Sequence, residues 1–384
     1  MKRVFIVKNA PLGESQPLSV DITSLLKNFK KEKNIELNLI ISKSPNIPQE
    51  ISSLCNKIYQ IKSSTYSIKD NLKFSFKVFN ILLKENRIKR IGLLQAIYPN
   101  SSLFGCVLFK LLHPSIKIIY EVRSPWIDMS VSQGYISENM QKLYLLILYN
   151  QERILCDFVN HFIFISKGLR DYYFSEFGIG DASYTIIPSG VDTNLFKKVE
   201  SNVRKKYGLK NSDLLLGYVG SIEKKRQLQD FLNLFANISK TNKKIKLILV
   251  GEGNSKEDLK NMVEAMKISN KVVFTGKVLH SEVPKYISSF DIGVCHLPDI
   301  FVYRNSFPLK ILEYLACGVP VISSNIKAHK DIARDLDGVY IYSDKESLKK
   351  ILNKKMIKMS KQINKYSWSN LANLYKEIYK TNEV

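Results

Sequence analysis

One stretch in the second half of the sequence combines a helix start, a cation and a carboxylate within six residues. Residues 304–324 read RNSFPLKILEYLACGVPVISS. Pro308 can begin a helix without losing a hydrogen bond, so the amides of Leu309 and Lys310 are expected to point at an oxyanion. Lys310 adds a cation, and Glu313 could accept hydrogen bonds from two vicinal hydroxyls. The stretch predicts a site for phosphate and ribose, with a plain surface i,i+3 ion pair as the alternative.

A second cationic stretch, SIEKKRQLQ, follows the apolar run LLLGYVG. Lys224, Lys225 and Arg226 would stand at the start of a helix, where free amides and the helix dipole already attract anions. We predict that they bind phosphate, and a solvated run of charges is the alternative. Two glycine turns, GEG at 251–253 and FTGKV ending at Val278, follow later apolar runs. Val278 could present its backbone to a planar base, although either turn alone is weak evidence.

Short β-type runs alternate with helical stretches along the whole sequence. The strands expected in the first half are VFIVKNA, IELNLIIS, IGLLQA, IKIIYEV, FIFIS and the run at 184–187. Those expected in the second half are LLLGYVG, IKLILVG, VVFTG, DIGVC, VPVIS and GVYIY. This alternation predicts parallel sheets covered by helices on both faces. Ligands of such sheets bind beyond the carboxyl ends of the strands, so the cationic stretches are well placed to form a site.

The expected fold class is α/β, with two Rossmann-like, doubly wound domains that face each other across a cleft. The alternation is interrupted at IIPSGVDTNLFKKVE, so we place the N-terminal domain at 1–187 and the C-terminal domain at 188–365. Residues 366–384 are expected to form a last helix. Its apolar face, which includes Trp368 and Tyr375, must dock somewhere, and we expect it to cross back to the N-terminal domain.

The composition limits the possible partners. The chain of 384 residues has a formal net charge of +23 and five scattered cysteines. The cysteines form neither a disulfide framework nor a zinc pattern, and the N-terminus is typical of a first strand rather than a secretion signal, so we expect a cytoplasmic protein. The charge suits nucleic acid, an anionic membrane or phosphorylated substrates, and solvated surface lysines alone are the simpler alternative.

Together these motifs resemble the family-four retaining glycosyltransferases, which have the GT-B fold. IIPSGVDTNLF is similar to the linker signature of the family, and LVGEG, FTGKV and FPLKILEYLACGVPVI occur in the order and spacing of the family. The resemblance implies a nucleotide-sugar donor on the C-terminal domain, an acceptor on the N-terminal domain, and transfer with retention of the anomeric configuration. It implies no cofactor and no metal, because protein cations and helix amides neutralise the leaving diphosphate.

The resemblance also implies roles for single residues. Arg226, Lys310 and Glu313 become the catalytic set: Arg226 matches a diphosphate-binding lysine, Lys310 meets the phosphates, and Glu313 takes the ribose hydroxyls. Leu309 joins Lys310 through its amide, and Val278 holds the base through its backbone.

Other positions complete or depart from the pattern. Pro308, Lys224 and Lys225 belong to the donor side. The family commonly has an arginine where this chain has Ser221, and Lys224 or Lys225 would compensate. The family has a carboxylate where this chain has Asn305, so Asn305 is limited to hydrogen bonds with hydroxyls of the donor sugar.

In the N-terminal domain, NAPLGES resembles the glycine-containing loop of the family that faces the diphosphate, with Gly13 alone in place of the usual glycine pair. IIYEVRSPW resembles the strand end of one subgroup, which puts Glu121, Arg123 and Trp126 on the acceptor side. No general base is assigned.

The stretch SIKDNLKFSFKVFNILLKENRIKR is predicted to form a basic amphipathic helix. It carries four lysines (Lys69, Lys73, Lys77 and Lys84) beside an apolar stripe (Ile68, Leu72, Phe76, Phe79 and Leu83). Such helices bind anionic bilayers, and a core-facing helix with a solvated basic back is the alternative. With the net charge and the family's frequent use of lipid-linked acceptors, we expect peripheral binding at the inner face of the cell membrane.

The expected function is transfer of a hexose from a nucleotide sugar to a saccharide or polyprenyl-linked acceptor, in the synthesis of a bacterial surface polysaccharide, such as capsule or lipopolysaccharide, or of a glycolipid. One alternative is a sugar-nucleotide epimerase of the same fold, which would turn over donor without acceptor. A less favoured alternative is a non-enzymatic basic nucleic-acid-binding protein. No recognised nucleic-acid-binding module is present in the sequence, so we expect no nucleic-acid partner.

Overall fold

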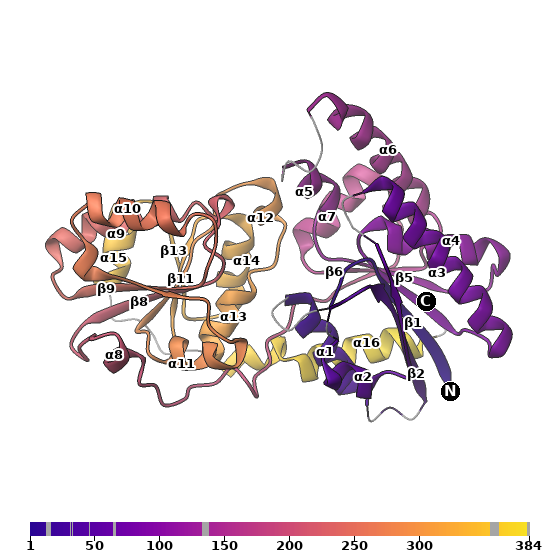
Figure 1. The fold of residues 1–384 in the computed structure, drawn as a ribbon, viewed down its shortest axis with the longest axis horizontal. Helices are drawn as coiled ribbons and strands as arrows, with labels where there is room; N and C mark the ends of the chain where they lie inside the picture. The colour runs from indigo at the N-terminus through magenta and orange to yellow at the C-terminus, as the bar shows by residue number, and fades with distance from the viewer. Residues whose placement is uncertain are drawn as a thin grey trace. The chain divides into compact units, whose positions relative to one another are not determined.

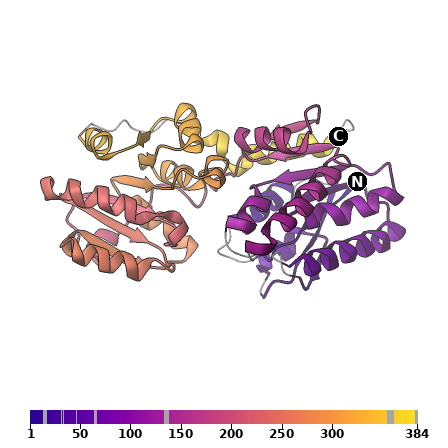
Figure 2. The ribbon, with the colours of Figure 1, turned by 90° about the horizontal axis from the view of Figure 1, so that it is seen from above.

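The chain folds into two compact units, which the computed structural model describes over residues 1–12, 17–30, 32, 34–45, 47–63, 67–132, 138–353 and 361–381. Unit 1 consists of Met1–Ser189 together with Trp368–Val384, and unit 2 is Gly190–Ser367. Figures 1 and 2 show one parallel sheet with covering helices in each unit.

Unit 1 is built on a seven-stranded parallel sheet with the strand order β3-β2-β1-β4-β5-β6-β7. Its strands are β1 (Lys2–Lys8), β2 (Ile35–Ser42), β3 (Lys57–Ile61), β4 (Leu93–Ile97), β5 (Ile118–Val122), β6 (His161–Phe164) and β7 (Tyr184–Ile186). Its helices before the linker are α1 (Pro17–Phe29), α2 (Gln49–Leu54), α3 (Ile68–Ile88), α4 (Asn100–Leu112), α5 (Trp126–Ser132), α6 (Glu138–Cys156) and α7 (Lys167–Phe177).

The helices of unit 1 form two layers. Connections through α1 and α2 run toward one edge of the sheet, and those through α3, α4, α6 and α7 run toward the other edge. Because parallel crossovers are right-handed, opposite directions place helices on opposite faces. The layer of α3, α4 and α6 therefore covers one face, and Figure 1 shows these helices on the side away from α1 and α2.

The last helix, α16 (Trp368–Lys380), belongs to unit 1 and packs on α1. It completes an apolar core that also contains residues of β1, β2 and α1. Its buried members are Trp368, Leu371, Ala372, Tyr375, Ile378 and Tyr379. This confirms the expectation that the C-terminal helix crosses back to the N-terminal part of the fold.

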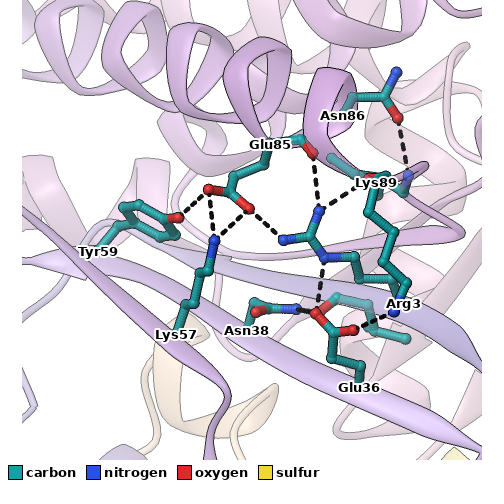
Figure 3. Close-up of polar contacts among 10 residues, drawn as sticks. Arg3, Glu36, Asn38, Lys57, Tyr59, Glu85, Asn86 and Lys89 are labelled. Atoms are coloured by element: carbon teal, nitrogen blue, oxygen red, sulfur yellow. Dashed lines mark hydrogen bonds and ion pairs between the residues drawn. The ribbon is translucent and has the colours of Figure 1, made fainter.

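A polar network fixes the end of α3 to the amino ends of the strands (Figure 3). Arg3 of β1 donates to Glu36 Oε1 at 2.8 Å and to the Glu85 carboxylate of α3. Glu85, only 3% exposed, also accepts hydrogen bonds from Lys57 and Tyr59 of β3. Breaking such a network would leave buried charges unpaired, so Glu85 must face the sheet.

Close contact with α4 fixes the orientation of the middle of α3. A Cβ atom added to Gly105 of α4 would lie 2.7 Å from the carbonyl oxygen of Ser75 and from Cβ of Val78. Glycine therefore allows the two helices to touch closely at Ser75, which also donates to the Ser101 carbonyl at 2.7 Å. The inward face of α3 consequently carries Ser75 and Val78.

Unit 2 is built on a six-stranded parallel sheet with the order β10-β9-β8-β11-β12-β13. Its strands are β8 (Leu214–Val219), β9 (Ile245–Val250), β10 (Val272–Gly276), β11 (Ile292–Cys295), β12 (Val321–Ser324) and β13 (Val339–Tyr342). Its longer helices are α9 (Leu228–Thr241), α10 (Lys256–Ala265), α13 (Leu309–Ala316), α14 (Lys327–Asp335) and α15 (Lys345–Leu352). The shorter ones are α8 (Val203–Lys206), η1 (Lys224–Arg226), η2 (Ser269–Lys271), η3 (His280–Glu282), α11 (Val283–Ser288), α12 (Phe301–Arg304) and η4 (Lys361–Tyr366).

Helices cover both faces of this sheet as well. Residues of α9 and α10 form one apolar core with it, and residues of α11, α13 and α14 form another on the opposite face. The expected α/β class with two doubly wound sheets is confirmed. In the part of the chain that the structure describes, no helix has the length and apolar character needed to cross a membrane.

Candidate functional site

The helix α13 is anchored to the sheet of unit 2 by one buried side chain. The Tyr314 hydroxyl accepts a hydrogen bond from the Val219 amide at 2.8 Å and donates to the Val294 carbonyl at 3.2 Å. These two groups lie at the carboxyl ends of β8 and β11. Gly318, with φ of +80°, ends the helix in the left-handed region, which favours glycine. The neighbour of Tyr314, Glu313, is thereby held at the edge of the sheet where ligands bind.

Glu313 and Lys310 form an ion pair at this edge. Lys310 Nζ lies 2.5 Å from Glu313 Oε2. The Lys310 side chain is 36% exposed, whereas that of Glu313 is only 4% exposed. The pair predicted as the structural alternative is therefore made, but its carboxylate is buried rather than on the surface. A buried carboxylate with a mobile, half-exposed cation suits a polar ligand better than a surface pair does.

Arg226 reaches the same edge from η1. Its Nε donates a weak hydrogen bond of 3.4 Å to Ser221 Oγ, and its guanidinium lies over the Tyr303 ring, 5.4 Å from the centroid. Burial raises the pKa of the Cys295 thiol to about 12; Arg226 and Lys310 act to lower this pKa and Glu313 acts to raise it. All three predicted catalytic side chains are thus close enough to act electrostatically on one thiol at the end of β11.

Backbone hydrogen bonds between successive loops hold the cationic stretch in place. Ile222 donates to the Glu252 carbonyl at 2.9 Å, and Gly251 donates to the Gly276 carbonyl at 3.0 Å. A Cβ atom at Gly251 would lie 1.9 Å from the Gly220 carbonyl oxygen. The GEG turn is therefore required by close packing of the loops after β8, β9 and β10.

The helix start differs from the expectation in one amide. Pro308 precedes the first residue of α13, and the Leu309 amide donates to the Phe307 carbonyl at 3.0 Å. The Leu309 amide is therefore engaged within the turn, which corrects the expectation that it is free. The Lys310 amide has no acceptor among the residues that the structure describes. Only one of the two predicted anion-binding amides is available.

The remaining donor-side residues are placed as follows. Asn305 is 8% exposed and its Nδ2 donates to the Phe301 carbonyl at 3.0 Å, which caps the short helix α12. Val278 is partly buried and packs on the core that contains α13. Lys224 is exposed, and Lys225 pairs with Glu223 at 2.8 Å. Arg226, rather than either lysine, is the cation in contact with the Ser221 side chain.

Two residues near the site were not singled out from the sequence. Burial lowers the pKa of His280, while Glu313 and Asp192 act to raise it and Lys310 acts to lower it. His280 follows β10, and Asp192 belongs to the SGVD stretch after the linker. Asp192 lies within the linker motif and His280 two residues beyond FTGKV, but a single histidine or aspartate in a loop carries no pattern of its own.

The acceptor-side residues of unit 1 belong to a buried polar cluster at the carboxyl ends of β4 and β5. Glu121 accepts hydrogen bonds from Gln95 at 2.5 Å, from Arg123 at 2.6 Å and from Tyr375 of α16 at 2.9 Å. Arg123 also pairs with Asp21 of α1. Because their polar atoms bind one another and α16, Glu121 and Arg123 have a structural task, and their role toward an acceptor stays a prediction.

Two further predictions concern unit 1: Trp126 on the acceptor side and Gly13 in the loop expected to face the diphosphate. Trp126 begins α5 and is half-buried, with its amide donating to Ser124 at 2.9 Å. Gly13 lies outside the described residues.

Lys8 lies at the end of β1, beside this cluster, and is 2% exposed. Its ammonium nitrogen is 4.8 Å from the centroid of the Tyr98 ring. Burial lowers the pKa of Lys8 to about 7, with Arg123 also lowering it and Glu121 and Asp21 raising it. The carboxyl edge of this sheet therefore holds a buried amine, which no motif in the sequence predicts.

Part of the predicted apolar stripe of α3 is exposed to solvent, whereas the alternative interpretation placed this stripe against the core. Ile68, Leu72 and Phe76 of the predicted apolar stripe are exposed, and the core side is formed by Phe74, Val78 and Leu82 among others. The lysines at 69, 73, 77 and 84 are exposed too. The alternative of a stripe that faces the core is wrong for the first half of this stripe.

Within the described ranges, no three His, Cys, Asp or Glu side chains gather in a way that could hold a metal ion. The arrangement in unit 2 is a buried carboxylate paired with Lys310, with Arg226 at the same end of the sheet, one helix amide without an acceptor in the described residues, and closely packed glycine turns. Such a set can neutralise a diphosphate and accept hydrogen bonds from hydroxyl groups.

Two family models match successive parts of the chain. Residues 22–195 match Glycosyltransferase Family 4, and residues 199–368 match Glycosyl transferases group 1. The chain is 28% identical over 146 residues to N-acetyl-alpha-D-glucosaminyl L-malate synthase of Bacillus anthracis, covering 38% of this chain and 36% of that protein. It is 28% identical over 144 residues to alpha-monoglucosyldiacylglycerol synthase of Streptococcus pneumoniae, covering 36% of this chain and 32% of that protein. The chain thus spans only about a third of the length of these two relatives.

Solved structures show the same fold over the whole length. Sucrose-phosphate synthase of Thermosynechococcus elongatus superposes with a TM-score of 0.74 at 16% identity, covering 99% of this chain and 98% of that one. HepE of Anabaena in complex with UDP-glucose superposes with a TM-score of 0.64 at 13% identity, covering 99% and 95%. With both halves matched by family models and the doubly wound sheets in place, the chain belongs to the family-four type of glycosyltransferases with the GT-B fold.

Proposed function

We propose that the protein is a retaining, metal-independent glycosyltransferase that moves a hexose from a nucleotide-sugar donor to a saccharide or lipid-linked saccharide acceptor, in the synthesis of a bacterial surface polysaccharide or glycolipid. The observation that carries this proposal is the buried Glu313 against Lys310, with Arg226 at the same end of the sheet of unit 2. The names of related proteins support the product classes: one is a synthase of a monoglucosyl lipid, and another is a glycosyltransferase of O-antigen biosynthesis.

In the proposed reaction, Arg226 and Lys310 stabilise the negative charge that grows on the leaving diphosphate. The Lys310 amide adds a fixed donor aimed at the same region. Donors that are positioned before reaction stabilise developing charge strongly in a site of low polarity. Glu313, whose carboxylate is buried and paired with Lys310 on a helix that Tyr314 anchors, accepts hydrogen bonds from the ribose hydroxyls. The bound complex of HepE supports UDP-glucose as the first donor to test.

A thermal-shift screen tests donor binding. The protein is heated with UDP-, GDP-, ADP- and CMP-sugars, and the screen is repeated with Glu313→Ala and with the surface variant Glu257→Ala as control. We expect one donor to raise the melting temperature of wild type and of Glu257→Ala, but not of Glu313→Ala. No response to any donor contradicts the proposal.

Three further measurements test the anomeric outcome, the independence of metal ions and the epimerase alternative. NMR of the product, obtained with the donor found above, reports whether the anomeric configuration is retained. Transfer in excess EDTA is expected to continue at the rate without chelator. Donor turnover in the absence of acceptor, with an altered sugar recovered, would instead identify an epimerase.

We also propose that the protein binds the inner face of the cell membrane through α3. Lysines at 69, 73, 77 and 84 are exposed there beside Leu72 and Phe76. Cations near an anionic surface contribute about 1 kcal/mol each and lose this contribution as salt screens them. Flotation with vesicles rich in phosphatidylglycerol at low salt is the test. Wild-type protein that stays unbound contradicts this part alone, since transfer to a soluble acceptor does not depend on it.

A further inference from the structure

Exposed large apolar side chains in this protein are concentrated on one helical layer. Of fifteen such residues among those described, ten belong to α3, α4 and α6. On α3 and α4 they are Ile68, Leu72, Phe76, Ile88, Leu111 and Leu112. On α6 they are Leu143, Leu146, Ile147 and Ile154. Single exposed apolar residues are ordinary on protein surfaces, but a cluster marks an interaction site.

The α6 residues form one stripe on the helix. The stripe consists of residues at intervals of three, one and seven positions: Leu143, Leu146, Ile147 and Ile154. On an α-helix these intervals place the four side chains within about a third of the circumference. Leu146 and Ile154 are each 60% exposed. The opposite face of α6 is occupied by Tyr144, Leu148, Glu152 and Leu155, which are buried. The stripe therefore points away from the sheet, and its residues are not part of the apolar core.

The three helices are neighbours in one layer. Helix α4 contacts both α3 and α6, and all three cover the same face of the sheet. The Phe76 ring of α3 meets the Phe104 ring of α4 edge-on at 6.4 Å between centroids. Figure 1 shows α3, α4 and α6 on the side of the unit 1 sheet away from α1 and α2. The exposed Phe76 of α3 is therefore in ring contact with α4, and the exposed residues of α6 lie on the next helix of the layer.

The packing of α3 does not allow its stripe to turn inward. The Glu85 network at one end and the close contact of Ser75 with Gly105 in the middle both fix the rotation of the helix. A buried carboxylate and a small polar residue point to the core while Leu72 and Phe76 point out. The exposed apolar face is thus a stable feature of the packed unit.

Charge indicates which partner covers this face. From Lys142 to Ile154, the exposed residues of α6 include Lys142 and Arg153, and the only acidic residue, Glu152, is buried. On α3, the exposed charged residues are lysines and Arg87, while Glu85 is buried and Asp70 is half-buried. Among the described residues of α3 and residues 142–154 of α6, exposed apolar side chains thus stand beside basic ones with no exposed acid, a combination that complements an anionic lipid bilayer. A second copy of the chain would bring an equally basic surface against it.

We infer that α4 and α6 form the apolar part of a membrane-docking face, in which their exposed leucines and isoleucines enter the acyl region while the lysines of α3 bind lipid headgroups. The inference rests on the proposed membrane binding through α3 and extends it to two further helices. The two parts differ physically, because salt weakens the lysine contribution and leaves the apolar contribution in place.

Vesicle flotation with matched variants separates the parts. The α6 variant is Leu146→Asp with Ile147→Asp, and the control is Leu279→Asp, which alters a leucine of unit 2 that is 73% exposed. A charge-reversal variant, Lys73→Glu with Lys77→Glu, reports on α3. Binding to vesicles of equal phosphatidylglycerol and phosphatidylcholine is measured at about 0.1 M and about 1 M salt, where the screening length falls from about 10 to about 3 Å.

We expect the α6 variant to bind at least tenfold more weakly than wild type at both salt concentrations, and the control to bind as wild type. The α3 variant should lose binding mainly at low salt. A tryptophan placed at Leu146 should be quenched by brominated lipid, and one placed at Leu279 should not. Circular dichroism and melting temperature verify that the substituted residues, which are exposed, leave the fold intact.

Three outcomes would overturn the inference. If the α6 variant floats like wild type, α6 is not part of the face, although α3 binding stands. If wild type binds no vesicles at low salt, the membrane proposal and this inference are both wrong, while donor binding is unaffected. If sedimentation shows a wild-type dimer that the α6 variant dissociates, with vesicle binding unchanged, the face is an interface between two copies.

Discussion

Lys310 Nζ lies 2.5 Å from Oε2 of Glu313, and the carboxylate of this pair is the buried partner. The pair contrasts with Lys260 and Glu257, which have the same i,i+3 spacing on α10 but a glutamate side chain that is 74% exposed. The same spacing thus produces a surface ion pair on one helix and a half-buried site on another.

This contrast provides a matched test of activity. Glu313→Gln should raise the KM for the donor at least about tenfold, because hydrogen bonds to a charged acceptor contribute about 1.5–3 kcal/mol. Lys310→Met should lower kcat about 100-fold or more, since it removes a cation that stabilises the leaving group. Glu257→Gln and Lys260→Met should leave both constants as in wild type. Steady-state kinetics with the donor found by thermal shift measures this, and equal losses in both pairs would contradict the role of the site.

Tyr314→Phe should destabilise unit 2. The substitution leaves the Val219 amide without its acceptor and the Val294 carbonyl without this donor, both at buried strand ends. A buried polar group without a partner costs about 1–3 kcal/mol, so the free energy of unfolding should fall by about that amount. Urea denaturation followed by circular dichroism measures the change. Tyr207→Phe is the control, because its hydroxyl lies 3.5 Å from that of Tyr286, at the limit of a hydrogen bond.

Glu85→Gln should make the free energy of unfolding depend less on pH in the acid range. Burial acts to raise the pKa of Glu85, but hydrogen bonds from Tyr59, Arg3 and Lys57 outweigh it and lower this pKa from 4.5 to about 2. A folded-state pKa below the unfolded value contributes stability that is present above about pH 4.5 and is lost as pH falls toward 2. The difference in unfolding free energy between wild type and Glu85→Gln should therefore shrink between pH 5 and pH 3. A difference that stays constant over this range would contradict the assignment, and Glu346→Gln on α15 gives the background for a surface site.

Lys8→Met should stabilise the protein, and its effect should depend on pH in a higher range. Burial lowers the pKa of Lys8 from 10.5 to about 7, so between these values the unfolded chain holds a proton that the folded protein has released. Stability then rises with pH from about 7 toward 10, and the cost of the buried charge is fully present below pH 7. The substitution should stabilise the protein more at pH 6 than at pH 9. Urea denaturation at both values, with Lys77→Met as surface control, tests this, and an equal effect at both values would contradict it.

Most of the fold could be predicted from the sequence, because both sheets are parallel and buried on both faces. Such strands are continuous apolar runs separated by helical periods, and all six strands of unit 2 were predicted. The strand that was missed, β3 (Lys57–Ile61), lies at the edge of the sheet in unit 1 and is only partly buried. An edge strand needs no continuous apolar run, so KIYQI did not stand out.

The candidate site could be predicted where the side chains that bind a ligand are close together in the sequence and start a helix. Pro308, Lys310 and Glu313 lie within six consecutive residues, and the structure brings them to the edge of the sheet with Arg226. The Leu309 amide and the hydrogen bonds of Glu121 were not predictable, because their partners depend on a turn geometry and on α16. Tertiary contacts far along the chain decide such details.

The orientation of α3 shows the same limit. Its more apolar stripe faces outward, because Gly105 on another helix and Arg3 on a strand decide which side packs. Periodicity reveals that a helix has an apolar face but not what covers that face.

The return of α16 to unit 1 has a consequence for biosynthesis. A ribosome releases residues 1–189 well before it makes Trp368–Lys380, and unit 2 is synthesised in between. Until then the nascent first unit lacks the six side chains of α16 that complete its core, together with the Tyr375 hydroxyl bound to Glu121. Unit 2, which is continuous in sequence, has no such gap. The second half of the chain can therefore finish folding before the first, and chaperones would meet the N-terminal unit with its core still open.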